Sequence, residues 1–235
     1  MDFGRTVLSE PYLGWLLAGT GMTIAISLVT SLLALAIGSF VSGLRTSGSR
    51  LLRGLAILHV QTFRNLPPVP LVLFLVLGLP GAWPQVFGHD FPKGMELQLL
   101  LAGLSLNTSG YVAEILRSGL RGVPPSQWDS CRALGLSPVT TRLRVIYPQA
   151  LRVCLPALGT RLIHNTKNST IALVIPLSSG SMEVLGQAGR IAGESFAWAE
   201  PLVFAALVHL SLAFALSALV NAAARRAQGK VAVAR

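Results

Sequence analysis

Four long segments without a single charged residue constrain this chain more than any other feature. They cover residues 11–44, 65–89, 97–113 and 201–224, and they contain 34, 25, 17 and 24 residues. A helix needs about 20 mainly apolar residues to cross a bilayer. Only 12% of the residues are charged, against about 25% in a typical soluble domain, so an ordinary soluble enzyme is not expected. The four segments predict four membrane-spanning helices.

A fifth segment, residues 156–176, is apolar but interrupted by polar side chains. Two interpretations fit it: an amphipathic helix on the membrane surface, or a span whose polar side faces the bundle interior or an aqueous path. The interrupting residues are Arg161, His164, Asn165, Lys167 and Asn168.

The distribution of basic residues favours five spans. Lys and Arg remain on the cytoplasmic side of short loops. With five spans and the N-terminus outside, one side collects thirteen basic residues against Asp129 and Glu114, and the other holds three against seven acids. The net charge of +10 then reports membrane topology rather than nucleic-acid binding. The thirteen are Arg45, Arg50, Arg53, Arg117, Arg121, Arg132, Arg142, Arg144, Arg152, Arg225, Arg226, Lys230 and Arg235. The three are Arg5, Lys93 and Arg190, and the acids are Asp2, Glu10, Asp90, Glu96, Glu183, Glu194 and Glu200.

The sequence therefore predicts an all-α polytopic membrane protein with about five transmembrane helices, forming one domain over residues 1–235. The N-terminus is expected outside and the C-terminus in the cytoplasm. No internal repeat or low-complexity linker divides the chain.

Residues that carry catalysis or bind metal are not expected in this chain. It has no G-x-x-x-x-G-K-[ST] motif to cradle ATP phosphates, and its one Gly-Lys pair, Gly229-Lys230, lies near the end of the sequence. Cys131 and Cys154 are too few for a disulfide framework or a metal site. His59 and His209 lie in apolar surroundings without another ligand at metal-binding spacing, so each is predicted to be a packed, hydrogen-bonded side chain.

The loop between the third and fourth spans, residues 121–149, has clear helix signals. Ser126 is predicted to cap a helix with Asp129 as its third residue, near the positive end of the helix dipole. Leu134 ends this helix, and Gly135 supplies the left-handed conformation that closes it. From local physics alone, the segment is either a solvated basic connection or a structured docking element.

A second short helix is predicted to follow in the same loop. Ser137 is its N-cap and Pro138 its first residue. One apolar face is expected from residues at helical spacing, and Pro148 is expected to mark the end of the helix. The face consists of Val139, Leu143 and Ile146.

This loop resembles the cytoplasmic coupling loop of ABC importer permeases. The family pattern is Glu-Ala-Ala, three residues, Gly, nine residues, then Ile-x-Leu-Pro. Asp129-Ser130-Cys131 stands at the triplet, Gly135 at the glycine and Ile146-Tyr147-Pro148 at the end. Two flanking motifs are close to those of permeases for polar amino acids, the histidine, glutamine and glutamate type. They are Arg-Ala-Leu-Gly-Leu-Ser-Pro at 132–138 and Pro-Gln-Ala-Leu-Arg at 148–152.

Other sequence motifs of the same family occur in the expected order. Phe-Arg-Asn-Leu-Pro at 63–67 resembles its Phe-Arg-Asn-x-Pro motif, and Leu-Gly-Leu-Pro at 77–80 the end of its second span. Tyr-Val-Ala-Glu-Ile-Leu-Arg-Ser-Gly at 111–119 resembles its third-span exit. Lys-Asn-Ser-Thr-Ile-Ala at 167–172 resembles its fourth-span Lys-(Asp/Asn)-(Ser/Thr)-Ser-Leu-Ala motif.

The resemblance implies a type I permease fold and a permease subunit in the bacterial inner membrane. Its expected partners are two ABC ATPase subunits that bind ATP and Mg²⁺, a second permease subunit, identical or paralogous, and an extracytoplasmic amino-acid-binding protein received by loops 80–96 and 178–200. The residues expected to couple the chain to the ATPase are Asp129, Arg132, Ala133, Leu134, Gly135 and Pro148.

A substrate pathway is expected around Lys167, because a cation at membrane depth is costly unless it faces polar surroundings. Interhelical hydrogen bonding or snorkelling is the alternative role for Lys167 and the polar residues around it, Asn165 included. Glu114 is a further candidate, although pairing with Arg117 at i+3 is the preferred interpretation. The charge of Lys167 suggests glutamate or aspartate as the substrate; a secondary transporter or channel without ATP is the rival function. The pathway candidates are Lys167, Asn168, Ser169, Thr170 and Glu114.

Overall fold

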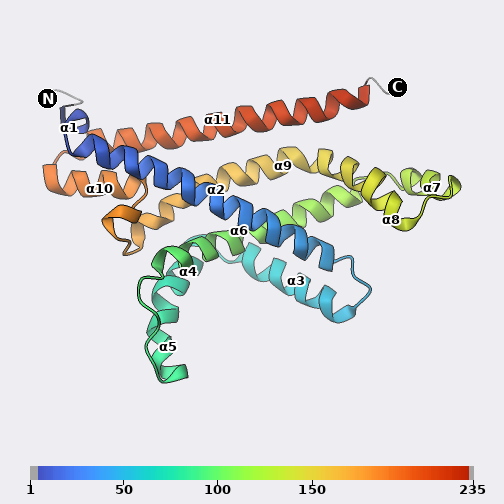
Figure 1. Cartoon of the computed structure of the whole chain (residues 1–235), viewed down its shortest axis with the longest axis horizontal. Coiled ribbons are helices and arrows are strands. Elements are labelled where there is room, and N and C mark those ends of the chain that lie inside the picture. The colour runs from blue at the N-terminus through green and yellow to red at the C-terminus, as the bar shows by residue number, and fades with distance from the viewer. Residues whose placement is uncertain (1–4, 233–235) are drawn as a thin grey trace.

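The computed structural model describes residues 5–232, and every regular element in that range is helical. Asp2 and Arg235, which entered the charge argument, lie outside the described residues. Four long helices form the body of the molecule (Figure 1). They are α2 (Tyr12–Leu44), α6 (Glu96–Arg121), α9 (Tyr147–Asn168) and α11 (Ala199–Ala232). The predicted all-α class is confirmed.

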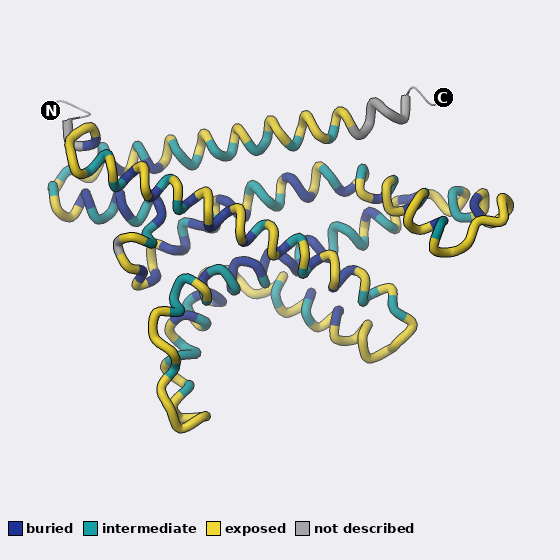
Figure 2. Tube along the Cα trace, viewed as in Figure 1, coloured by how far each residue is buried: buried dark blue, intermediate teal, exposed yellow. Residues whose placement is uncertain are grey.

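The bundle is organised around α6. The helices α2 and α9 pack against α6 and against each other, and α11 lies against α9. Buried residues concentrate where α2, α6 and α9 meet, whereas the outer side of α11 is exposed (Figure 2). Gly38 permits the close approach of α2 to α6, because a Cβ at this position would lie 2.6 Å from Val112 Cβ.

Within the described residues, four helices are long and apolar enough to cross a membrane. They are Tyr12–Leu44, Pro68–Phe87, Glu96–Arg121 and Ala199–Arg226, at the four predicted segments. The helix α9 does not reach this threshold, because polar residues interrupt it. Nevertheless it packs against α6, α11 and α2 and buries Leu158, Gly159 and Asn165. The fifth segment is therefore a polar-sided member of the bundle rather than a surface helix.

Helix α3 (Arg50–Asn65) is an element that the sequence pattern did not predict. The Ser49 hydroxyl caps its start by accepting from the Leu52 N–H at 3.5 Å. It packs through Ala56 and Val60 against α2 and α6. It ends at Leu66, whose extended conformation (φ −77°, ψ 127°) is the one that a residue before proline adopts.

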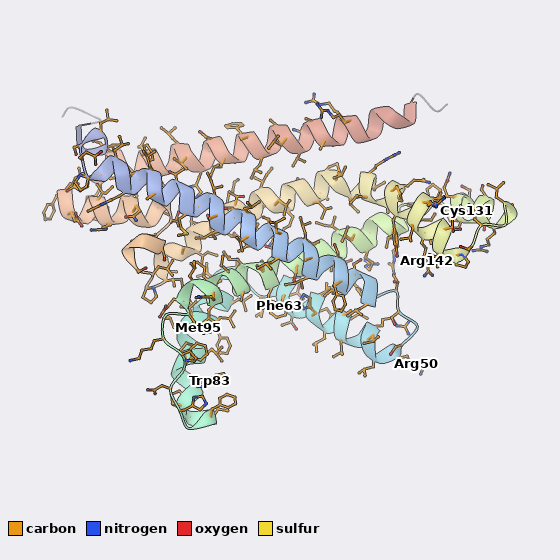
Figure 3. All side chains as sticks on the ribbon, in the orientation of Figure 1. Arg50, Phe63, Trp83, Met95, Cys131 and Arg142 are labelled. Atoms are coloured by element: carbon orange, nitrogen blue, oxygen red, sulfur yellow. The ribbon has the colours of Figure 1, made fainter. Side chains whose placement is uncertain are left out.

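The second predicted span is a composite helix that leaves the bundle. It consists of α4 (Pro68–Leu73), a π-helical segment (Phe74–Gly78) and α5 (Leu79–Phe87). The Leu79 N–H donates to the Phe74 carbonyl, five residues earlier. This wider turn precedes Pro80, which has no N–H to continue the α-helical pattern. Figure 1 shows α5 projecting from the bundle, and Trp83 lies on this projection in Figure 3.

Short elements close the end of the bundle near the N-terminus. They are α1 (Arg5–Leu8), α10 (Val184–Ser195) and two 3₁₀ segments, Ser169–Val174 and Ser179–Ser181. Glu183 is fully buried and caps α10, accepting from the Leu185 and Gly186 N–H groups at 2.9 Å each. The same carboxyl lies 3.3 Å from Thr23 Oγ1 on α2 and 3.9 Å from His209 Nε2 on α11. Glu183 thus joins three helices at one point.

Burial raises the pKa of Glu183 above its usual value, although the two backbone N–H groups oppose this. In the unfolded chain the carboxyl loses its proton near pH 4.3, but in the folded chain it does so at higher pH. Its contribution to stability is therefore complete below about pH 4.3 and is lost as pH rises through the folded-state pKa.

We expect the thermal unfolding temperature of the detergent-solubilised protein to fall as the pH rises above about 4.3, and Glu183→Gln to reduce this fall. Glu194→Gln is the matched control, because that side chain is 44% exposed and pairs only with Arg190 at 3.0 Å. An unchanged profile in Glu183→Gln would contradict the prediction.

Candidate functional site: a protruding loop and a polar side of α9

The loop 121–149 forms a structured protrusion at one end of the molecule. It contains α7 (Pro125–Ala133) and α8 (Pro138–Thr140). Figure 1 places α7 and α8 at the end opposite α1 and α10, and Figure 3 shows Cys131 and Arg142 there. The predicted helix, turn and helix are confirmed.

The turn between the two helices depends on Gly135. Its φ is +68°, in the left-handed region that glycine adopts without strain. The Leu136 N–H donates to the Cys131 carbonyl and the Gly135 N–H to the Arg132 carbonyl, each at 3.0 Å. This is the Schellman arrangement that ends a helix. Ser137 then caps α8 as predicted, accepting from the Thr140 N–H at 3.2 Å.

Two local predictions in this loop were wrong. Ser126 does not cap α7: the helix already begins at Pro125, and its N-cap position, Pro124, makes no side-chain bond. Proline at the first helical position has the required φ and needs no N–H partner, so the helix starts two residues earlier than predicted. Pro148 does not end the second helix either, because it lies in the first turn of α9.

A π-helical segment, Thr141–Ile146, joins α8 to α9 without a break. The Tyr147 N–H donates to the Arg142 carbonyl, five residues earlier, as in the segment before Pro80. This pattern lets the helix continue past Pro148. Residues 138–168 therefore form one continuous helix.

The protrusion exposes a large apolar surface. Leu134, Val139 and Leu143 are 76%, 65% and 59% exposed, whereas Ile146, predicted to share their face, is fully buried. Asp129 and Arg132 approach each other at 3.7 Å with exposed side chains. Ala133, Gly135 and Pro148 are also exposed, so every predicted coupling residue is accessible on this loop.

The helix α9 has a polar exposed side along the bundle. Thr160, His164 and Lys167 follow one another at helical spacing, and all three are exposed. Asn168 is partly exposed. Ser169 and Thr170 serve the end of the helix instead, because their hydroxyls donate to the carbonyls of Thr166 and Lys167 at 2.7 and 2.8 Å.

A buried polar network joins the helices, and in it Asn165 takes the interhelical role that was the alternative for the polar residues around Lys167. Asn165 donates to Thr30 Oγ1 at 2.7 Å and Ser31 Oγ at 3.0 Å, and it accepts from Thr108 Oγ1 at 2.9 Å. It therefore links α9 to both α2 and α6. Its position inside an apolar segment was visible in the sequence, but its partners lie 57 to 135 residues away.

Arg161 belongs to the same polar region, and no role was predicted for it. It donates to Asn107 Oδ1 at 2.7 Å and Thr108 Oγ1 at 3.1 Å. Its guanidinium carbon lies 3.8 Å from the ring centre of Tyr111. A guanidinium among neutral oxygens and an aromatic ring is accommodated without an acidic partner.

Glu114 lies between two cations near the loop end of α6. It bonds to Arg117, as the i+3 interpretation predicted, and also to Arg45 at the end of α2. This ion-pair group joins α2 to α6.

The remaining candidates are packed side chains. His59 Nε2 lies 2.9 Å from Ser109 Oγ, and His209 Nδ1 donates to the Ala205 carbonyl at 3.0 Å, so both histidines are hydrogen-bonded as predicted. Cys131 and Cys154 are free thiols. Among the described residues, no three His, Cys, Asp or Glu side chains gather where they would hold a metal ion.

Several known permeases are similar in sequence. The chain is 34% identical to the arginine transport system permease protein ArgU of Corynebacterium glutamicum, over 80% of this chain and 60% of that protein. It is 33% identical to the glutamate/aspartate import permease protein GltJ of Escherichia coli, over 80% and 76%. The probable amino-acid ABC transporter permease protein YckA of Bacillus subtilis is 31% identical, over 88% and 87%.

Solved structures share the fold. An amino acid ABC transporter crystallised with histidines superposes with a TM-score of 0.81 at 26% identity, over 96% of this chain and 99% of that chain. The MetNI methionine ABC transporter, in an inward-facing conformation, gives 0.69 at 20% identity, which shows the fold alone. Residues 33–229 match the family described as the binding-protein-dependent transport system inner membrane component. The chain belongs to this family and is a permease of the ABC importer type.

Proposed function

We propose that this chain is the permease subunit of an ATP-driven importer for polar amino acids, with glutamate or aspartate as the first candidates. It has no catalytic site of its own. ATP and Mg²⁺ bind to a separate ATPase subunit, and the permease converts the closure of that subunit into alternating access.

The observation that carries this proposal is the exposed apolar surface of the protruding loop. Leu134, Val139 and Leu143 lie on a rigid element at the end of the molecule and are mostly exposed. Exposed apolar patches of this kind mark protein interfaces. The partner that we propose is the ATPase subunit, with Asp129 and Arg132 adding polar contacts at the rim.

The continuous helix from residue 138 to residue 168 explains how movement of the docked ATPase subunit reaches the membrane-spanning helices. A rotation of α7 and α8 moves α9 as one body, since no flexible linker separates them. The buried bonds of Asn165 and Arg161 then engage α2 and α6. Nucleotide-driven movement at the loop thereby reaches the centre of the bundle.

The exposed polar side of α9 supports a pathway role for Lys167 and Asn168. His164 and Lys167 are too polar to face lipid, since each uncompensated polar group in hydrocarbon costs several kcal/mol. They would face a second permease subunit, identical or paralogous, and the path between the two copies. Of the other candidates, Glu114 is already paired and Ser169 is buried.

The remaining assembly follows from the same family. It comprises two ATPase subunits, two permeases and an extracytoplasmic binding protein that loops 80–96 and 178–200 receive, in the inner membrane of a bacterium. The N-terminus would lie outside and the C-terminus in the cytoplasm. This orientation places the basic loop with Arg142 and Arg144 inside, in agreement with the positive-inside rule.

Reconstitution tests the function directly. We expect ATP hydrolysis by the complete complex in proteoliposomes to rise when the binding protein is loaded, most strongly with glutamate or aspartate in a panel that includes glutamine, histidine and arginine. Uptake that proceeds at full rate without the ATPase subunit would show that the proposal is wrong.

A further inference from the structure

A polar cavity lies between α2, α3 and α6. Its volume is about 190 Å³, room for roughly six water molecules at about 30 Å³ each. Ile57 and Val60 form its apolar wall, and the polar lining residues are Arg45, Gln61, Arg64, Asn65 and Glu114. Helix α3 supplies most of this lining.

The cavity has an excess of positive charge. Two arginines, Arg45 and Arg64, line it with one carboxylate, Glu114. That carboxylate is already bonded to Arg45 and Arg117. Arg64 forms no ion pair with any other residue that the structure describes. An unpaired guanidinium beside two side-chain amides is suited to a bidentate contact with a carboxylate.

The backbone that carries Arg64 is held in place by α6. Tyr111 Oη donates to the Arg64 carbonyl at 3.0 Å, and Asn107 Nδ2 donates to the carbonyls of Phe63 and Leu66 at 2.8 and 3.0 Å. Arg161 supports both of these residues, through its bond to Asn107 and its position over the Tyr111 ring. The Phe-Arg-Asn-Leu-Pro motif at 63–67 is thus fixed at the end of α3, which preorganises the cavity for a ligand.

We propose that this cavity binds the transported amino acid and that Arg64 holds its α-carboxylate. The side-chain oxygens of Gln61 and Asn65 face the α-ammonium group. The ligand class rests on the proposed transport function, whereas the site rests on the cavity and its charges. Because every amino acid has an α-carboxylate, Arg64 acts on all substrates alike, and other contacts select among side chains.

The test is binding of radiolabelled glutamate and arginine to the purified permease–ATPase complex without binding protein. We expect the wild-type complex to bind at least one of the two, and Arg64→Gln to weaken that binding roughly tenfold to a hundredfold. Arg64→Lys should restore part of it, because the charge returns without the bidentate geometry. Arg53→Gln is the matched control, since Arg53 is an exposed arginine of the same helix that does not line the cavity.

Basal ATP hydrolysis by the same samples distinguishes failure of the proposed site from failure of the proposed transport function. Normal hydrolysis with lost binding in Arg64→Gln supports the site. Wild-type binding in Arg64→Gln, or an assembled and stimulated wild-type complex that binds neither amino acid, overturns the site and leaves the transport function intact. If the Arg64→Gln complex does not assemble, amino-acid binding is measured with Gln61→Trp instead. An indole at this exposed position fills the cavity and should block binding. Unchanged binding in Gln61→Trp also overturns the proposal.

Discussion

Replacing Gly135 by valine is expected to release the ATPase subunit from the permease. The residue has a φ of +68°, and a left-handed backbone costs an L residue about 1–2 kcal/mol, with a larger cost for a β-branched side chain. The Schellman turn would open and alter the angle between α7 and α8. We expect recovery of the ATPase subunit with the tagged permease to fall about tenfold or more, since about 1.4 kcal/mol corresponds to a factor of ten in affinity.

Gly88→Val provides the matched control. Gly88 has a φ of +74° and, like Gly135, nothing within 4 Å of an added Cβ, but it lies at the end of α5. The same backbone strain is thus placed far from the protruding loop. Gly88→Val should retain the ATPase subunit. Equal loss in both variants would show that strain lowers global stability and that the loop has no special part in docking.

Replacing Asn165 by leucine is expected to destabilise the bundle. The substitution keeps the approximate volume but removes three hydrogen bonds, to Thr30, Ser31 and Thr108. Interhelical hydrogen bonds in membrane proteins average about 0.6 kcal/mol each, so the expected loss is about 2 kcal/mol. Thermal unfolding in mild detergent, followed by tryptophan fluorescence, should show a transition lower by several degrees.

Asn221→Leu is the comparison for this experiment. Asn221 is exposed on α11, and its 3.5 Å bond to Ser217 is local. Its replacement removes an amide of the same size without separating helices, so the unfolding temperature should remain near that of the wild type. A transition in Asn165→Leu at or above the wild-type temperature would mean that the network does not stabilise the fold.

The features that could be predicted from the sequence depend on neighbouring residues. Uncharged runs of sufficient length specify the spans, because a bilayer excludes charge. Gly135, Ser137 and Pro138 specify a turn and a helix start through their own backbone preferences. The pairing of Glu114 with Arg117 follows from helical spacing alone. Each of these rests on contacts within about one helical turn.

The errors arose where a local rule competed with a longer element. Pro148 normally ends a helix, yet here a π-helical segment absorbs the missing N–H and the helix continues. Ser126 is a good capping residue, but Pro125 had already begun the helix. Helix α3 was not predicted, and its buried residues Ala56 and Val60 pack against α2 and α6.

By itself, then, the sequence determined the all-helical membrane fold and the helix–turn–helix shape of the loop that we propose binds the ATPase subunit. Only the tertiary structure decided that Arg161 and Asn165 bind across helices, that Glu183 joins α2, α10 and α11, and that Arg64 lines a charged cavity. The reason is distance along the chain: these contacts join residues separated by 26 to 160 positions. No local propensity encodes such a contact before the helices have packed.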